Sequence, residues 1–152
     1  MVQSTENNHY SVKGSSLSVV RLMDVNLNRC REGLRVLEDT ARLVCNQTQW
    51  FKEIRFCRHQ LDLLTRSRYL DLVASRQSQK DPGRSIAEKK RSDIQSIIYA
   101  NFRRCEESLR VLEEYGKLFE EDQSVQFKAL RFKIYSLEKK VISKIQLGQL
   151  IK

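Results

Sequence analysis

The chain contains one long motif twice, and this internal repeat limits its fold more than any other feature. Residues 26–39 (NLNRCREGLRVLED) return 75 positions later as residues 101–114 (NFRRCEESLRVLEE). Residues 51–56 (FKEIRF) return as residues 127–132 (FKALRF), with one residue inserted between the two motifs of the second copy. Two copies of one unit that can bury their apolar faces against each other predict a duplicated architecture.

Both copies have the apolar spacing of an α-helix, and residues that favour turns are scarce. The 152 residues include only five Gly and one Pro, whereas a β-sandwich or barrel needs turn residues at short intervals. We therefore expect an all-α fold of four long helices. They form two duplicated helical hairpins that close into a bundle with a pseudo-two-fold axis.

The first half of the chain has clear predicted boundaries. Residues 1–16 are polar and lack periodicity, so we expect a disordered tail before a single domain at 17–150. The first unit spans about 20–73. Its first helix ends near Val44, and Thr48 is suited to cap its second helix.

The second half begins after the strongest turn signal of the chain. The linker loop is expected at 74–85, around Asp81-Pro82-Gly83. The second unit spans about 86–150. A capping-box sequence at 85–88 predicts the start of a third helix that ends near residue 119, and Asp122 is suited to cap the fourth.

The net charge of +9 is concentrated in the middle of the chain, where residues 52–91 hold 11 basic and 5 acidic side chains. Such a zone suits nucleic acid, an anionic membrane surface or a phosphorylated small molecule, and charge alone does not choose among them.

The cysteines and the hydropathy pattern indicate a cytoplasmic protein. Cys30, Cys45, Cys57 and Cys105 form no C-x-x-C pair, and the two histidines complete no metal pattern. We expect reduced, buried thiols. No stretch approaches the roughly 18 apolar residues of a membrane span.

Each copy carries polar residues on its apolar helical face. Asn26 and Arg29 lie inside this arc with Glu32 at its edge, and the second copy repeats them as Asn101, Arg104 and Glu107. A guanidinium there is costly unless it is paired or holds a ligand, and its fixed donors suit carboxylate or phosphate. Two interpretations stay open: an anion site, or polar clusters that lock the register of the bundle.

For other polar residues, a structural role is a simpler explanation than a role in binding or catalysis. Arg35 and Arg110 lie on the polar face, where ion pairs with Glu38 and Glu113 are favoured by spacing. His59, next to Arg58, could serve as an acid–base group or phosphate donor, although a lone histidine is more often structural.

Residues 24–42 and 100–117 resemble the two hallmark stretches of a small helical domain that is often fused ahead of thiamine-phosphate synthase. The resemblance covers about 20–141, including the pair Arg58-His59, the Asp81-Pro82-Gly83 loop and Arg91. Val25 and Cys30 stand where alanine is expected in that family. Nothing that resembles a synthase barrel follows.

The resemblance implies a standalone phosphomethylpyrimidine kinase of thiamine biosynthesis. It would transfer the γ-phosphoryl group of ATP to 4-amino-5-hydroxymethyl-2-methylpyrimidine phosphate, with ATP and Mg²⁺ as cofactors, by alignment and charge neutralisation. The implied catalytic residues are Arg29, Arg104 and Asp81, and the implied metal ligands are Glu32 and Glu107. The implied substrate- and phosphate-binding residues are Asn26, Arg35, Arg58, His59, Gly83, Arg91, Asn101 and Arg110.

Two further functions are compatible with the sequence. One is a non-catalytic basic helical module that binds nucleic acid or an acidic partner, although no dense basic stripe with interleaved aromatic residues is evident. The other is a purely structural or regulatory bundle. We expect small-molecule ligands rather than nucleic acid or membrane, and a pseudo-symmetric bundle with long apolar faces could also form a homodimer.

Overall fold

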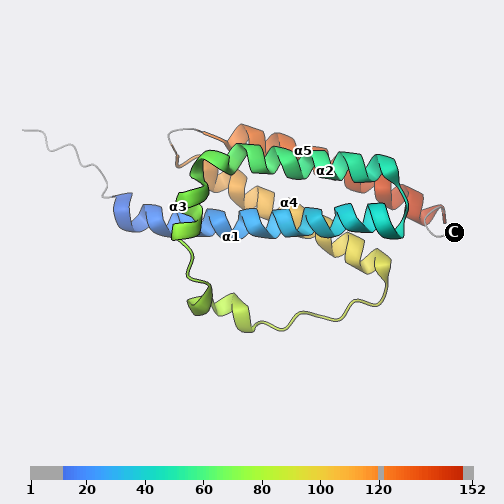
Figure 1. Ribbon diagram of the computed structural model, residues 1–152, viewed down its shortest axis with the longest axis horizontal. Helices are drawn as coiled ribbons and strands as arrows, with labels where there is room; N and C mark the ends of the chain where they lie inside the picture. Colours follow the sequence, from blue (N-terminus) through green and yellow to red (C-terminus); the bar gives the residue numbers. More distant parts are fainter. Residues whose placement is uncertain (1–11, 120–121, 149–152) are drawn as a thin grey trace, which may run out of the picture.

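Four long helices form the bundle in a computed structural model that describes residues 12–119 and 122–148, with side chains from Leu17 onward (Figure 1). They are α1 (Val12–Asp39), α2 (Thr48–Thr65), α4 (Ile94–Gly116) and α5 (Ser124–Gln146), and a short α3 (Tyr69–Ala74) follows α2. The described residues contain no strand. The predicted all-α fold of four long helices is confirmed.

The four helices surround one core because each presents apolar residues three or four positions apart. α1 packs on α2 and α4, and α5 packs on the same two helices. Burying one large apolar side chain stabilises the fold by about 1.5–3 kcal/mol. All four cysteines are buried and unpaired, as predicted. Fully buried residues of the core include Cys30, Leu34, Cys57, Leu61, Phe102, Cys105, Leu109, Phe127 and Ile134.

The first helix is longer than predicted at its amino end and irregular at its carboxyl end. It begins at Val12, inside the predicted tail, whose residues 1–11 lie outside the described part. Once a helix is nucleated by packed turns, each added residue gains a hydrogen bond, so weak formers can extend it. A π-helical turn at Thr40–Val44 then leads to Asn46, whose φ of 52° reverses the chain in the left-handed region.

The second helix differs from the prediction at both ends. Thr48 is its first residue rather than its cap, and the N-cap residue Gln47 makes no capping hydrogen bond. A 3₁₀ turn at Arg66–Arg68 separates α2 from α3. The hydroxyl of Thr65 donates to the carbonyl of Leu61 (3.1 Å), a bond that competes with the helical ladder and bends helices.

The predicted start of the third helix is wrong. The 85–88 sequence lies in an exposed segment, and α4 begins only at Ile94. There Asp93 accepts from the amide of Ser96 (2.7 Å), while the amide of Asp93 donates to the hydroxyl of Ser96 (3.3 Å). Residues 86–93 include three consecutive cations and bury no apolar face, so packing does not support a helix there.

The fourth long helix begins close to its predicted cap. The carboxylate of Asp122 accepts from the amide of Ser124 (2.8 Å), although Gln123 occupies the N-cap position. Val36 of α1 and Leu43 of the π-helical turn are 39% and 64% exposed, so both lie outside the core. No helix in the described residues has both the length and the apolar character needed to cross a membrane.

Candidate functional site

Two adjoining cavities form one groove, which we call the central groove, between α1, the 75–93 loop and α4. The first, of about 880 Å³, lies between α1 and the early part of the loop. The second, of about 950 Å³, lies between the loop and α4. Arg29, Glu32 and Gly83 line both. Figure 1 shows the loop on the opposite side of the bundle from α2 and α5.

The central groove gathers most of the residues that the sequence singled out. Arg29 and Arg104, which are equivalent in the two copies, come from two helices and line the same cavity. The loop contributes Asp81 to the first cavity and Arg91 to the second. The remaining predicted residues that line the groove are Asn26, Glu32, Gly83 and Glu107.

The positive charges of most arginines in the groove are not balanced by an ion pair. Within the described part of the chain, Arg29, Arg91 and Arg103 form no ion pair. Arg104 pairs with Glu88 of the loop at 2.9 Å, and both side chains are partly exposed. An exposed pair of this kind contributes at most about 1 kcal/mol, so an anionic ligand can displace it.

The prediction that Arg29 points into the core is wrong. Arg29 is exposed and makes no ion pair with Glu32, so it does not lock the register of the bundle. Its long side chain reaches from the edge of the apolar face into the groove. Asn26 is buried and Asn101 partly so, and each donates to the carbonyl four residues earlier, at 2.9 and 2.8 Å.

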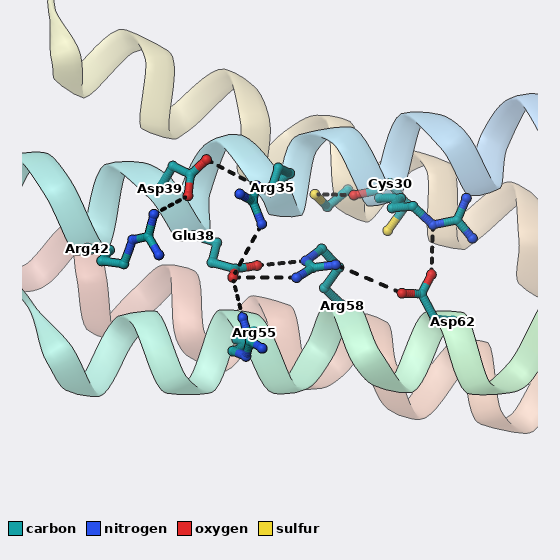
Figure 2. Close-up of polar contacts among 10 residues, drawn as sticks. Cys30, Arg35, Glu38, Asp39, Arg42, Arg55, Arg58 and Asp62 are labelled. Atoms are coloured by element: carbon teal, nitrogen blue, oxygen red, sulfur yellow. Dashed lines mark hydrogen bonds and ion pairs between the residues drawn. The ribbon is translucent and has the colours of Figure 1, made fainter.

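Five predicted ligand-binding residues line neither cavity of the groove: Arg35, Arg58, His59, Asn101 and Arg110. Arg58 instead donates from Nε to the buried carboxylate of Glu38 (2.6 Å), and Arg35 contacts the same carboxylate at 3.8 Å. Figure 2 shows Arg35, Arg55 and Arg58 around Glu38. Burial by itself would raise the pKa of Glu38, but hydrogen bonding to Arg58 and the surrounding positive charge hold the pKa below its usual value.

The second copy repeats this arrangement. Glu113, also buried, accepts from Arg131 (2.7 Å) and from Arg110 (2.9 Å). Arg35 and Arg110 are therefore in ion pairs, as their spacing favoured. His59 is exposed on α2 and lines neither cavity.

The loop is attached to α1 by residues that the sequence reasoning missed. The buried carboxylate of Asp24 accepts two hydrogen bonds from Arg76 (2.7 and 2.9 Å), and Arg21 donates to Gln77 (2.6 Å). The carboxylate of Asp81 accepts from the amide of Gly83 (2.8 Å), which shapes the turn. An Asp on the buried side of α1, just ahead of Asn26, was the available signal for this anchor.

Replacing Asp24 with Asn is expected to release the loop from α1. The bidentate, charge-assisted contact with Arg76 is lost, which should lower the free energy of unfolding by about 1–2 kcal/mol. Trypsin should then cleave faster between residues 76 and 91, as followed by mass spectrometry of the fragments. Asp71→Asn, an exposed change without an ion pair among the described residues, is the control. Equal cleavage rates in the two variants would contradict the anchoring role.

The two acidic residues predicted as metal ligands both line the second cavity. Glu32 and Glu107 line the same cavity from α1 and α4, and both are exposed. Across the described residues, no group of three or more His, Cys, Asp or Glu side chains is arranged to hold a metal ion.

Comparison with known proteins finds a family and a set of relatives. A family model described as the ThiD2 family matches residues 21–140. The chain is 40% identical over 123 residues to a thiamine-phosphate synthase of Nostoc sp. (strain PCC 7120), covering 79% of this chain and 34% of the relative. It is 39% identical over 133 residues to that of Nostoc punctiforme (85% and 37%), and 34% identical over 125 residues to that of Rhodopirellula baltica (80% and 33%).

These relatives correct the predicted reaction. Their name, thiamine-phosphate synthase, denotes a different reaction from that of the predicted phosphomethylpyrimidine kinase. Nothing in the comparisons supports ATP as a substrate. The chain spans about a third of the length of the curated relatives it matches. No solved structure matches it.

Proposed function

Because this chain belongs to the ThiD2 family, we propose that it is an enzyme or enzyme domain of thiamine biosynthesis that binds a phosphorylated intermediate in the central groove. The names of its relatives point to thiamine phosphate or one of its phosphorylated precursors as the class of ligand. The observation that carries the proposal is the convergence of Arg29 and Arg104 on one cavity.

The charges of this cavity suit a phosphate group. Arg29, Arg91, Arg103 and Arg104 line it, against three glutamates, and three of these arginines have no ion pair within the described residues. A planar guanidinium can donate two parallel hydrogen bonds to phosphate oxygens, and such charge-assisted bonds are about twice as strong as neutral ones.

Each group has a proposed role. Arg29 and Arg104 bind the phosphate from opposite helices, and Arg91 closes on it from the loop. Asn26 orients the organic part of the ligand through its carbonyl oxygen, because its amide donates to Leu22. The carboxylate of Asp81 holds the turn at Gly83.

A divalent cation fits this arrangement only together with a phosphorylated ligand. Mg²⁺ is usually held by one or two carboxylates, several waters and substrate phosphates. Glu32 and Glu107 supply two exposed carboxylates on the cavity that also holds the arginines. These two residues would hold the ion, which would offset the charge of the bound phosphate.

Calorimetric titration with thiamine phosphate, using unphosphorylated thiamine as the matched ligand, tests the proposal. Thiamine phosphate should bind and raise the melting temperature, because a ligand of the folded state stabilises it by mass action. Arg29→Ala and Arg104→Ala should each weaken binding about tenfold or more, the equivalent of about 1.4 kcal/mol.

Arg42→Ala is the control, since Arg42 is exposed, pairs with Asp39 and lines neither cavity. Equal binding of the two ligands, or no effect of the groove variants, would overturn the proposal. Tight and steeply salt-dependent binding of random-sequence DNA would instead favour the nucleic-acid alternative.

A further inference from the structure

The segment between the turn at Gly83 and the start of α4 has few contacts with the bundle, and residues 86–93 are all exposed. At one end, the amide of Ile86 donates to the carbonyl of Gly83 (3.2 Å). At the other end, Asp93 caps α4 by accepting from the amide of Ser96 (2.7 Å). Across residues 87–91, the ion pair of Glu88 with Arg104 is the one polar contact among the described residues. Glu88 therefore tethers this segment to α4.

The tether lies inside the second cavity of the central groove. A terminal nitrogen of Arg104 donates to a carboxylate oxygen of Glu88 (2.9 Å), and both side chains line the cavity together with Arg29. The carboxylate thus occupies the guanidinium to which we assign the phosphate of the ligand.

Glu88 differs from the other two glutamates of this cavity. Glu32 and Glu107 belong to the helices, and neither forms an ion pair within the described part of the chain. Glu88 belongs to the loop and pairs with one of the arginines. It can leave that arginine without moving a helix of the bundle.

A carboxylate and a phosphate compete for a guanidinium, because both present oxygens that accept from its N–H groups. A carboxylate has one negative charge and two oxygens, whereas a phosphate monoester has a charge of about −1.5 to −2 at pH 7 and three free oxygens. Glu88 pairs with Arg104 alone, whereas a phosphate between the two helices can accept from Arg29 as well. The phosphate is therefore the stronger competitor.

We propose that Glu88 is an internal competitor of the ligand: it occupies Arg104 in the empty groove, and the phosphate must expel it in order to bind. This inference rests on the proposed function of the groove and adds a gate to it, because expulsion of Glu88 releases residues 86–92 from α4. Arg104 and Glu88 are 37% and 72% exposed, so the competition lowers the affinity of the ligand by about fivefold at most.

Trypsin digestion of the full chain without ligand tests the tether. Arg104→Ala leaves residues 86–92 themselves unchanged and should speed cleavage after Arg91 by about twofold to fivefold. Glu88→Gln should have a similar effect, and the double variant should be no faster than either single one, because all three lose the same contact. Glu114→Gln, which changes a partly exposed, paired carboxylate elsewhere on α4, is the control. Wild-type cleavage rates in Arg104→Ala and Glu88→Gln would overturn the inference.

Calorimetric titration tests the competition. Glu88→Gln should bind thiamine phosphate about twofold to fivefold more tightly than the wild type. The same change made in the Arg104→Ala variant should lose this gain, since Glu88 then has no guanidinium to occupy. An equal gain with and without Arg104 would reveal only a general effect of charge and would overturn the inference.

Inorganic phosphate is titrated in parallel, so that the inference and the proposed function fail separately. If inorganic phosphate binds Glu88→Gln more tightly than the wild type but thiamine phosphate binds neither, the proposed function is wrong and the gate stands. If thiamine phosphate binds the wild type and Glu88→Gln equally, the proposed function stands and the gate is wrong. Failure of both ligands to bind would overturn both.

Discussion

Replacing Glu38 with Ala is expected to lower the free energy of unfolding by about 3 kcal/mol. The side chain of Glu38 is only 1% exposed and lies among three arginines. Arg58 contacts it at 2.6 Å, Arg55 at 3.3 Å and Arg35 at 3.8 Å. Removing the carboxylate leaves the partly buried guanidinium of Arg58 without its main partner, and desolvated unpaired charge is strongly unfavourable.

Urea denaturation at pH 7 measures this loss. Glu114→Ala is the matched control, because Glu114 also pairs with two cations but is 43% exposed, and exposed pairs contribute at most about 1 kcal/mol. Similar losses for the two variants would contradict the importance of burial.

The carboxylate of Glu38 should also make the stability of the protein depend on pH in the acid range. Because the folded structure lowers the pKa of Glu38, its contribution is present above its ordinary pKa near 4.5 and disappears as the pH falls through the lower folded value. Glu38→Gln should therefore be much less stable than the wild type at pH 7, and the difference should shrink below pH 4.

Replacing Gly33 with Leu is expected to destabilise the crossing of α1 and α4 by about 3 kcal/mol or more. Even a single Cβ at Gly33 would lie 2.7 Å from Sγ of Cys105 and 3.2 Å from the backbone oxygen of Asn101. Cys105 is fully buried and hydrogen-bonds to the carbonyl of Cys30, so it has little room to move. The helices would have to separate to admit a larger side chain.

Gly116→Ala provides the control at another buried helical glycine. A Cβ there meets its neighbours at 3.4 Å or more, which is ordinary contact, so Ala should be neutral or stabilising by up to about 1 kcal/mol. Thermal and urea denaturation should separate the two variants clearly. A stable Gly33→Leu protein would show that the crossing tolerates a wider spacing.

The positions of the arginines show how much of the candidate site could be predicted from the sequence. Repetition identified Arg29 and Arg104 as equivalent, and the structure brings both to one cavity. The family resemblance grouped Arg58 with them, yet Arg58 binds Glu38 on the other side of α1. Helical periodicity gives the direction of a side chain but not the neighbour that it meets. The anchor between Asp24 and Arg76 was missed for this reason, since it joins residues 52 positions apart.

The sequence by itself determined the helical class and showed the repeated motif, because these depend on local periodicity and on repetition. It did not determine where helices begin: α4 starts at Ile94 rather than near Ser85, since burial rather than a capping sequence decides which residues stay helical. Only the tertiary structure decided which polar residues face the groove and which form buried ion pairs. The physical reason is that the energy of a charge depends on the groups that packing brings beside it.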